Sequence, residues 1–356
     1  MVDALSGLLT KGLVVVAAFG LLILVHELGH FVVARWSGVR ILRFSIGFGP
    51  KLFGWRRGDT DYWVSWLPLG GYVKMAGEQA SEHRQEPGEF LSKPVGIRAL
   101  IVLAGPAVNY LSAVVLLWLF FWIGYPGLLP VVGDVTDGMP AQTAGFQPED
   151  VVIRIEDRKI STWDEMTSLI RARAGEPLRM RVRRGDRDLT LEVTPVETVV
   201  TDAAGEELAI GMIGIGAGVL KVGPLGALAL AGKTLHHWTL QTFAGLGSLV
   251  TGRRSLKESV TGPLGIVYLT SEAVSLGLGP LLILVSLFSL SLAIFNVFPI
   301  PVLDGGHLLF LAIEWLRGRP VSINVQERAT MVGLALLLTL VLVVTVYDLN
   351  RYWLSK

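Results

Sequence analysis

The stretch LVVVAAFGLLILVHELGHFVVA, residues 13–34, decides what kind of fold this chain adopts. It is long and apolar enough to cross a hydrocarbon core, which takes about 20 residues of helix. The apolar run continues past His30 and no small-residue cleavage pattern follows it, so the sequence predicts a retained membrane helix instead of a cleaved signal peptide. Three ionisable residues, His26, Glu27 and His30, lie inside this run.

The composition of the whole chain also indicates a membrane protein. Its 356 residues are 51% hydrophobic and 17% charged, and the mean hydropathy is +0.55. A soluble protein needs a larger charged shell than this. The net charge of +1 gives no field that would favour nucleic acid as a partner. Because the chain contains no cysteine, any metal must be held by histidine and carboxylate ligands.

Four stretches have the length and composition of membrane spans: residues 12–34, 98–124, 280–300 and 330–349. The weaker apolar stretch 222–250 contains a lysine, two histidines and many glycines, which favours an interfacial or re-entrant helix over a fifth span. Basic residues cluster in the loops after the first and third spans, and such loops face the cytoplasm. The segment between the second and third spans and both termini are therefore predicted on the outer side.

The loop of residues 44–75 contains strand-like runs rich in aromatic residues and broken by glycine and proline. We interpret it as a β-hairpin that dips into the membrane, where its open edge must be covered by protein or face a cavity. The hairpin is therefore expected to lie against the helices that form the active site. A plain interfacial loop is the alternative.

Residues 129–196 have the pattern of a small water-soluble domain. Alternating residues on both sides of Gly185-Asp186 predict a hairpin, and Ser161-Thr162 is a helix cap ahead of Trp163–Ala174. The run from Pro140 to Ile155 resembles bacterial PDZ domains. PDZ domains bind an extended peptide at a sheet edge, and a spacer that binds nothing is the alternative. Three acidic positions stand where the family usually has glycine: Glu149, Glu156 and Asp157.

The pattern His26-Glu27-Leu28-Gly29-His30 fits H-E-x-x-H, which places two imidazoles one helical turn apart on one face with a carboxylate beside them. These are two zinc ligands and a general base. A charged residue at the centre of a membrane helix costs roughly 2.5–3.5 kcal/mol to insert. Packing alone is therefore a poor explanation for this cluster.

A catalytic zinc site needs a third protein ligand and an open position for water. In NVFPIPVLDGG, residues 296–306, two prolines end a helix ahead of Asp304. A helix that breaks inside a membrane is expected at a functional site. At about 1.5 Å per residue, the helix rises about 20 Å from Leu13 to His26 and about 22 Å from Leu281 to Asn296. Both motifs therefore lie at the same depth in the membrane. Asp304 is therefore the best candidate for the third ligand. His307 ranks below it, and Glu314, which lies among surface-like residues, is a weaker candidate.

The segment Gly105-Pro106-Ala107-Val108-Asn109 opens the second span. Its glycine permits close helix approach, and a membrane asparagine usually hydrogen-bonds across helices, so a structural role is one interpretation. The other places Asn109 near the path of the substrate.

Together these motifs resemble the site-2 protease family of intramembrane zinc metalloproteases, in particular the bacterial branch typified by the regulator of sigma-E protease. The matching motifs, in the family's order, are His26–His30, Gly105–Asn109, Gly262–Ile266 and Asn296–Gly306. The resemblance implies a polytopic α-helical membrane protein with about four transmembrane helices, a membrane-associated β-hairpin and one α/β PDZ-like domain. Close relatives often carry two PDZ domains, whereas this chain has room for one.

Seven segments follow from these assignments. They are a first transmembrane helix with HExxH (1–36), a cytoplasmic-side loop with the hairpin (37–97), a second transmembrane helix (98–126), the PDZ-like domain (127–200), a linker with interfacial helices (201–279), a third transmembrane helix with the NxxPxPxLDGG motif (280–318), and a fourth transmembrane helix with a tail (319–356).

The resemblance implies a zinc metalloendopeptidase that performs regulated intramembrane proteolysis. Zn²⁺ is expected on His26, His30 and Asp304, with Glu27 as the catalytic base and Asn296 and Asn109 as substrate-binding residues. Expected partners are the lipid bilayer and single-span membrane proteins, such as anti-sigma factors, that another protease has shortened. The expected location is the bacterial inner membrane, with the PDZ-like domain and both termini in the periplasm.

Three other functions fit the sequence less well. A membrane zincin of another family would take a glutamate as third ligand, and the chain offers no convincing glutamate motif. A non-catalytic scaffold with a PDZ domain leaves the buried histidines and carboxylates unexplained. A metal transporter would spread its ligands along a path through several helices, whereas here they converge on one depth.

Overall fold

The computed structural model describes residues 2–79, 83–201, 207–220, 222–253, 255 and 260–351. The chain divides into two compact units. One, called here the membrane unit, contains the described residues up to Leu117 and from Ala231 onward, and the other, the PDZ-like unit, runs from Trp118 to Leu230. Two helices cross this boundary, α2 (Val95–Ile123) and α5 (Pro224–Val250).

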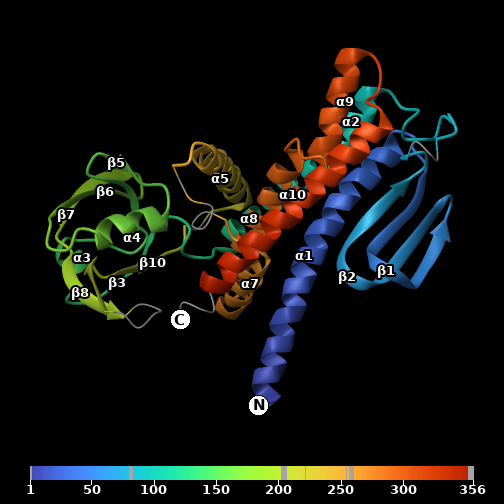
Figure 1. Ribbon diagram of the computed structural model, residues 1–356. Coiled ribbons are helices and arrows are strands. Elements are labelled where there is room, and N and C mark those ends of the chain that lie inside the picture. Colours follow the sequence, from blue (N-terminus) through green and yellow to red (C-terminus); the bar gives the residue numbers. More distant parts are fainter. Residues whose placement is uncertain are drawn as a thin grey trace. The chain divides into compact units, whose positions relative to one another are not determined.

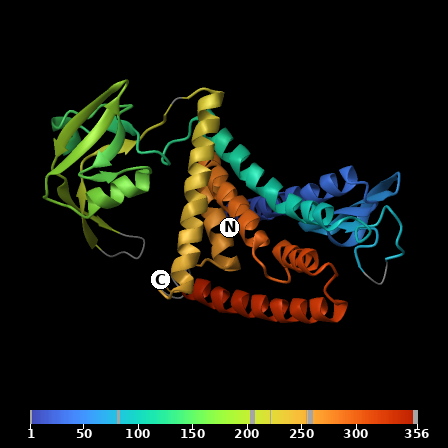
Figure 2. The same ribbon diagram turned by 90° about the horizontal axis from the view of Figure 1, so that it is seen from above.

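Four helices among the described residues are long and apolar enough to cross a membrane: α1 (Val2–Trp36), α2, α8 (Leu278–Val297) and α10 (Ile323–Leu349) (Figure 1). In α1 the candidate span is Gly12–Trp36. This confirms the predicted number of spans. Among the described residues, the membrane unit also contains two shorter helices, α7 (Pro263–Leu276) and α9 (Asp304–Arg317). In the most apolar stretch of α2, 44% of the residues are buried, whereas in that of α10 only 11% are buried. Figure 2 shows α10, in red, along one side of the membrane unit, and its low burial means that the rest of the described chain leaves most of it uncovered.

The third span ends earlier than the sequence predicted, at Val297 instead of residue 300. Phe298 has an extended backbone because Pro299 follows it, and the residue before a proline is driven out of the helical region. The chain then turns, and α9 begins at Asp304, so Gly305 and Gly306 lie in the first turn of that helix.

The predicted hairpin is present as two long strands, β1 (Ile41–Arg57) and β2 (Thr60–Met75). The first half of β1 pairs with both halves of β2: Phe44, for example, pairs with Tyr62 on one side and with Val73 on the other. The last part of β2, residues 71–75, is therefore an outer strand of this sheet. It runs beside α1 (Figure 1). Gly20 of α1 lies so close that a Cβ there would meet the Pro68 carbonyl oxygen at 2.6 Å.

Between the end of α2 and the start of α5, the described residues of the PDZ-like unit form short strands and two helices. Its elements are β3 (Val132–Val135), α3 (Pro140–Thr143), β4 (Val151–Ile155), β5 (Arg158–Lys159), α4 (Trp163–Arg171), β6 (Leu178–Arg184), β7 (Arg187–Val193), β8 (Val196–Thr201), β9 (Glu207–Met212) and β10 (Ile215–Ala217). The main sheet has the order β5-β4-β6-β7. Alternate residues of β6, Leu178, Met180 and Val182, point into its core, as the sequence pattern predicted.

Local predictions for this unit are confirmed. Thr162 caps α4 by accepting a hydrogen bond from the Glu165 backbone N–H, and β6 and β7 form the predicted hairpin. Glu149 and Glu156 have φ angles of +71° and +49°, a conformation that glycine adopts at less cost. Strand β10, in the segment assigned from sequence to a linker, pairs with β3 of the domain.

Candidate metal and catalytic site

The two histidines of the first motif point to the same side of α1. Their rings meet edge to face, with centroids 4.8 Å apart and an interplanar angle of 84°. The Nε2 atoms of His26 and His30 are 3.1 Å apart, and both residues are buried. Two imidazole nitrogens this close, away from water, need a proton or a metal ion between them because each otherwise presents a lone pair.

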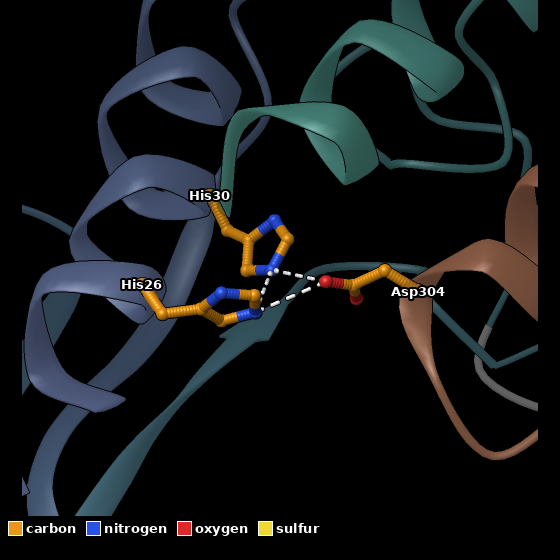
Figure 3. A group of neighbouring side chains, drawn as sticks. All are labelled: His26, His30 and Asp304. Carbon is orange, nitrogen blue, oxygen red and sulfur yellow. Dashed lines mark hydrogen bonds and ion pairs between the residues drawn. The ribbon is translucent and has the colours of Figure 1, made fainter. Parts of the chain in front are cut away.

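Asp304, the first residue of α9, completes this group (Figure 3). Its Oδ2 lies 3.0 Å from His26 Nε2 and 3.5 Å from His30 Nε2. These are ion-pair distances, yet this buried oxygen accepts no hydrogen bond from the described part of the chain. The three ligand atoms all lie within 4.8 Å of one another.

The three side chains fit a zinc ion. Zinc binds histidine and carboxylate atoms at about 2.0–2.2 Å in tetrahedral geometry, which puts neighbouring ligand atoms about 3.3 Å apart. The separations in this structure are 3.0, 3.1 and 3.5 Å. Three protein ligands leave the fourth position open for water or substrate, as in catalytic zinc sites.

Close packing of glycines brings α9 to this position. A Cβ on Gly305 would collide with the carbonyl oxygens of Val297 and Phe298, at the end of α8. A Cβ on Gly306 would meet the Ile300 carbonyl oxygen at 2.5 Å. The two glycines after Asp304 therefore allow the first turn of α9 to fold directly onto the proline-containing connection.

Glu27 lies beside the histidines and lines a pocket of about 250 Å³. Its Oε2 accepts a hydrogen bond from the Val73 backbone N–H at 3.2 Å. The carboxylate thus connects α1 to the outer strand of the sheet and keeps its second oxygen for other contacts. The residues lining the pocket come from α1, α2, α8, the connection after it and α9: Ile23, His26, Glu27, Asn109, Leu292, Asn296, Val302, Leu303 and Asp304.

The structure brings together all six candidate residues. Asn296, in the last turn of α8, lines the pocket. Asn109, from α2, lines it too, and its side-chain nitrogen is 3.2 Å from His26 Nδ1. His307 follows one turn after Asp304 in α9 and is not part of the group of three ligand atoms found among the described residues.

The surface-like environment expected for Glu314 is wrong. Its carboxylate forms two hydrogen bonds with the guanidinium of Arg98, at 3.1 and 2.5 Å, and both side chains are largely buried. The pair joins the start of α2 to α9, the helix that begins with Asp304. A signal for it existed in the sequence, because Arg98 is the one charged residue within α2 and a charge in a membrane helix needs a partner.

These features define a polytopic membrane protein with a pocket between its helices that contains possible metal ligands, and comparison with known proteins defines its family. The model of peptidase family M50 matches residues 14–340, so the chain belongs to this family. The zinc metalloprotease RasP of Geobacillus kaustophilus is 31% identical, over 99% of this chain and 100% of that protein. RasP of Oceanobacillus iheyensis is 30% identical, over 94% of this chain and 98% of that protein.

The chain is therefore a zinc metalloprotease of the site-2 protease family and a multi-pass protein of the bacterial inner membrane. The resemblance and the cofactor predicted from sequence are confirmed. Among solved structures, the PDZ domain of an SdrC-like protein from Listeria monocytogenes is similar, with 20% identity and a TM-score of 0.20, over 26% of this chain and 88% of that chain. A PDZ domain from Listeria innocua has 19% identity and a TM-score of 0.20, over 26% of this chain and 92% of that chain.

Proposed function

We propose that this chain cuts single-span membrane proteins within or beside the bilayer, in regulated intramembrane proteolysis of substrates such as anti-sigma factors. One observation supports this most strongly: three possible zinc ligands converge on α1 and at the start of α9, in a unit of membrane-length helices. A peptide bond must enter this unit to reach the pocket. Soluble loops are poor candidates for that, whereas a membrane segment of another protein is already at the right depth.

The proposed ligands are His26, His30 and Asp304. When bound, zinc lowers the pKa of a coordinated water to about 7 and polarises the scissile carbonyl. Glu27 takes the proton from the attacking water and afterwards gives it to the leaving amine. The hydrogen bond from the Val73 N–H to Oε2 holds this carboxylate toward the pocket and leaves Oε1 to carry the proton.

Substrate binding is assigned to the pocket and the sheet edge beside it. A substrate helix has its carbonyl groups in internal hydrogen bonds, so it must unwind before attack. The β1–β2 sheet, next to Glu27, offers strands along which an unwound segment could be held extended. Asn296, at the pocket wall, is proposed to donate to the substrate backbone or to the oxyanion formed during attack.

The decisive experiment uses purified full-length protein in detergent or liposomes with single-span model substrates. The wild-type protein should cut them, while Glu27→Gln should be inactive but still hold zinc, because it lacks the base and keeps all three ligands. A chelator should abolish cleavage and added Zn²⁺ should restore it. Cleavage by Glu27→Gln at the wild-type rate would rule out the proposed role of Glu27.

The proposed orientation puts both termini and the PDZ-like unit in the periplasm, with the β1–β2 sheet on the cytoplasmic side. Reporter fusions at the termini and protease treatment of intact spheroplasts can test it. The PDZ-like unit should be cut from outside and the loop between β1 and β2 protected. The reverse pattern would invert the orientation.

We propose further that the PDZ-like unit selects substrates and contributes no catalytic group. Size exclusion of proteins with bulky outer portions and recruitment of a newly made carboxyl terminus are the two possible modes. To distinguish these two modes, residues 129–196 are replaced by a flexible linker and the zinc content of the variant is verified. Cleavage of an unshortened substrate is then compared with cleavage of a shortened one. Exclusion predicts that an unshortened substrate is now cut, recruitment predicts that a shortened one is cut more slowly, and unchanged rates contradict both.

A further inference from the structure

One face of α2 forms a wall behind the two histidines. Ile101, Gly105 and Asn109 are four residues apart, so they lie along one face of this helix. A Cβ on Gly105 would collide with the His30 ring and would lie 2.8 Å from His26 Cε1. On the other side, a Cβ on Gly29 of α1 would meet the Ala104 carbonyl oxygen at 2.5 Å. The imidazoles thus pack directly on the backbone of α2.

The backbone of α2 fixes the first of these rings. His30 Nδ1 is 2.9 Å from the Ile101 carbonyl oxygen. A carbonyl oxygen can only accept, so Nδ1 carries the hydrogen and donates it. The lone pair of His30 then lies on Nε2, the atom that faces His26 and Asp304.

The second ring meets a side chain instead. His26 Nδ1 is 3.2 Å from the side-chain amide of Asn109, which is fully buried. If His26 is to offer a lone pair at Nε2, Nδ1 must carry the hydrogen, and the amide must present its oxygen. The oxygen and nitrogen of the amide exchange places on a half-turn about its last bond. The oxygen has no hydrogen-bond partner among the described residues, so no other described group fixes which end faces His26.

Asn109 itself is held firmly. Ser289 of α8 is fully buried and donates a hydrogen bond from Oγ to the Asn109 backbone carbonyl at 2.8 Å. The residue therefore joins three helices: its backbone binds α8, its own helix is α2, and its side chain reaches α1. A side chain anchored in this way can set the rotation of an imidazole.

We propose that Asn109 is a positioning residue for the metal: its Oδ1 accepts a hydrogen bond from His26 Nδ1–H and so holds His26 with Nε2 free to bind zinc. This rests on the proposed ligand set. It makes the wall of α2 a second layer of the metal site, with a backbone carbonyl orienting one histidine and a side-chain amide orienting the other. Partners of this kind typically change metal affinity 10–100-fold when removed.

The test is a zinc affinity measurement on the full-length protein in detergent, by competition with a chromophoric chelator. Asn109→Leu keeps the size of the side chain but cannot accept a hydrogen bond, so affinity should fall about 10–100-fold. Asn109→Asp still accepts from Nδ1–H and should stay close to the wild-type value. Ser112→Ala is the matched control, because it loses a hydrogen bond within the same helix, from Oγ to the Val108 carbonyl oxygen, that involves no proposed ligand, and it should leave zinc affinity unchanged.

The Co²⁺-substituted protein gives a second readout. Its visible absorption should keep the wild-type shape in Asn109→Asp and change in Asn109→Leu, because only the latter releases the ring of His26. Wild-type zinc affinity in Asn109→Leu would overturn the proposal. An equal loss in the Asp and Leu variants would also overturn it, since that pattern means packing alone. Neither readout involves cleavage, so a failure of the proposed protease mechanism, seen with Glu27→Gln, is recognised separately.

Discussion

Two aspartates near the ends of membrane-unit helices have opposite surroundings. Asp348, close to the end of α10, is buried and accepts hydrogen bonds from the backbone N–H groups of Gly262 and Gly265, at 3.1 and 2.8 Å. It caps the first turn of α7. Asp304 directs a buried oxygen at two imidazole nitrogens and accepts no hydrogen bond there from the described residues.

The comparison separates a structural charge from a functional one. A buried carboxylate whose two oxygens each accept a hydrogen bond from a backbone N–H is already stabilised by the protein and needs no metal ion. One that converges with histidine nitrogens and lacks a donor is ready for a metal ion. Both aspartates have a buried carboxylate oxygen in the membrane unit, although Asp348 is buried as a whole and Asp304 only in part, and their partners differ.

The largest effect is expected at Asp304. In Asp304→Ala two ligands remain, which cannot hold the metal firmly, so zinc and proteolytic activity should be lost together, activity by more than about 100-fold. Zinc content by atomic emission and cleavage of a single-span substrate measure this. His307→Ala is the control and should keep both. If the two variants exchange these phenotypes, the third ligand is His307.

Glu314 is a third carboxylate of the membrane unit, and it should behave like the structural Asp348 and not like Asp304. Glu314→Ala leaves the Arg98 guanidinium buried without its partner, and breaking such a pair costs about 3–5 kcal/mol when fully buried. Both side chains here keep some exposure, so about 3 kcal/mol is expected, as a lower midpoint in thermal unfolding. Folded Glu314→Ala protein should still contain zinc. Loss of zinc without loss of stability would make Glu314 a ligand and contradict the assignment.

Asp348 should behave as a structural residue. Asp348→Ala leaves two backbone N–H groups without an acceptor, each costing about 1–3 kcal/mol, so stability should fall while zinc stays bound. Asp348→Asn keeps one acceptor oxygen and should lose about half as much. Thermal unfolding in detergent with zinc analysis decides this. A loss of zinc at unchanged stability would remove the distinction between the two aspartates.

The smallest effect is expected in the PDZ-like unit, where water can replace a lost partner. Thr162→Ala removes the cap of α4, worth about 1 kcal/mol. Circular dichroism during thermal unfolding of the full-length protein should show a slightly earlier transition of this unit, with unchanged zinc content. A loss above about 3 kcal/mol would mean that Thr162 does more than cap a helix.

Much of this protein could be predicted because its signals are local. Apolar runs of spanning length predicted the helices, and H-E-x-x-H placed His26 and His30 on one face of α1. Prolines after Val297 predicted the helix break ahead of Asp304. Glu314 was misjudged because its partner, Arg98, is far away in sequence. The lone charge within α2 indicates that Arg98 needs a partner, but local composition does not say which residue supplies it.

The sequence by itself determined the class of protein, the number of spans and the residue types available for a metal, because helix length, hydropathy and i, i+4 spacing act within one segment. Only the tertiary structure decided what each polar group faces. It set Asp304 against two histidines, Asp348 against α7 and Asn109 against His26. The physical reason is that a buried polar group costs free energy unless it finds a partner, and in this chain those partners come from helices distant in sequence.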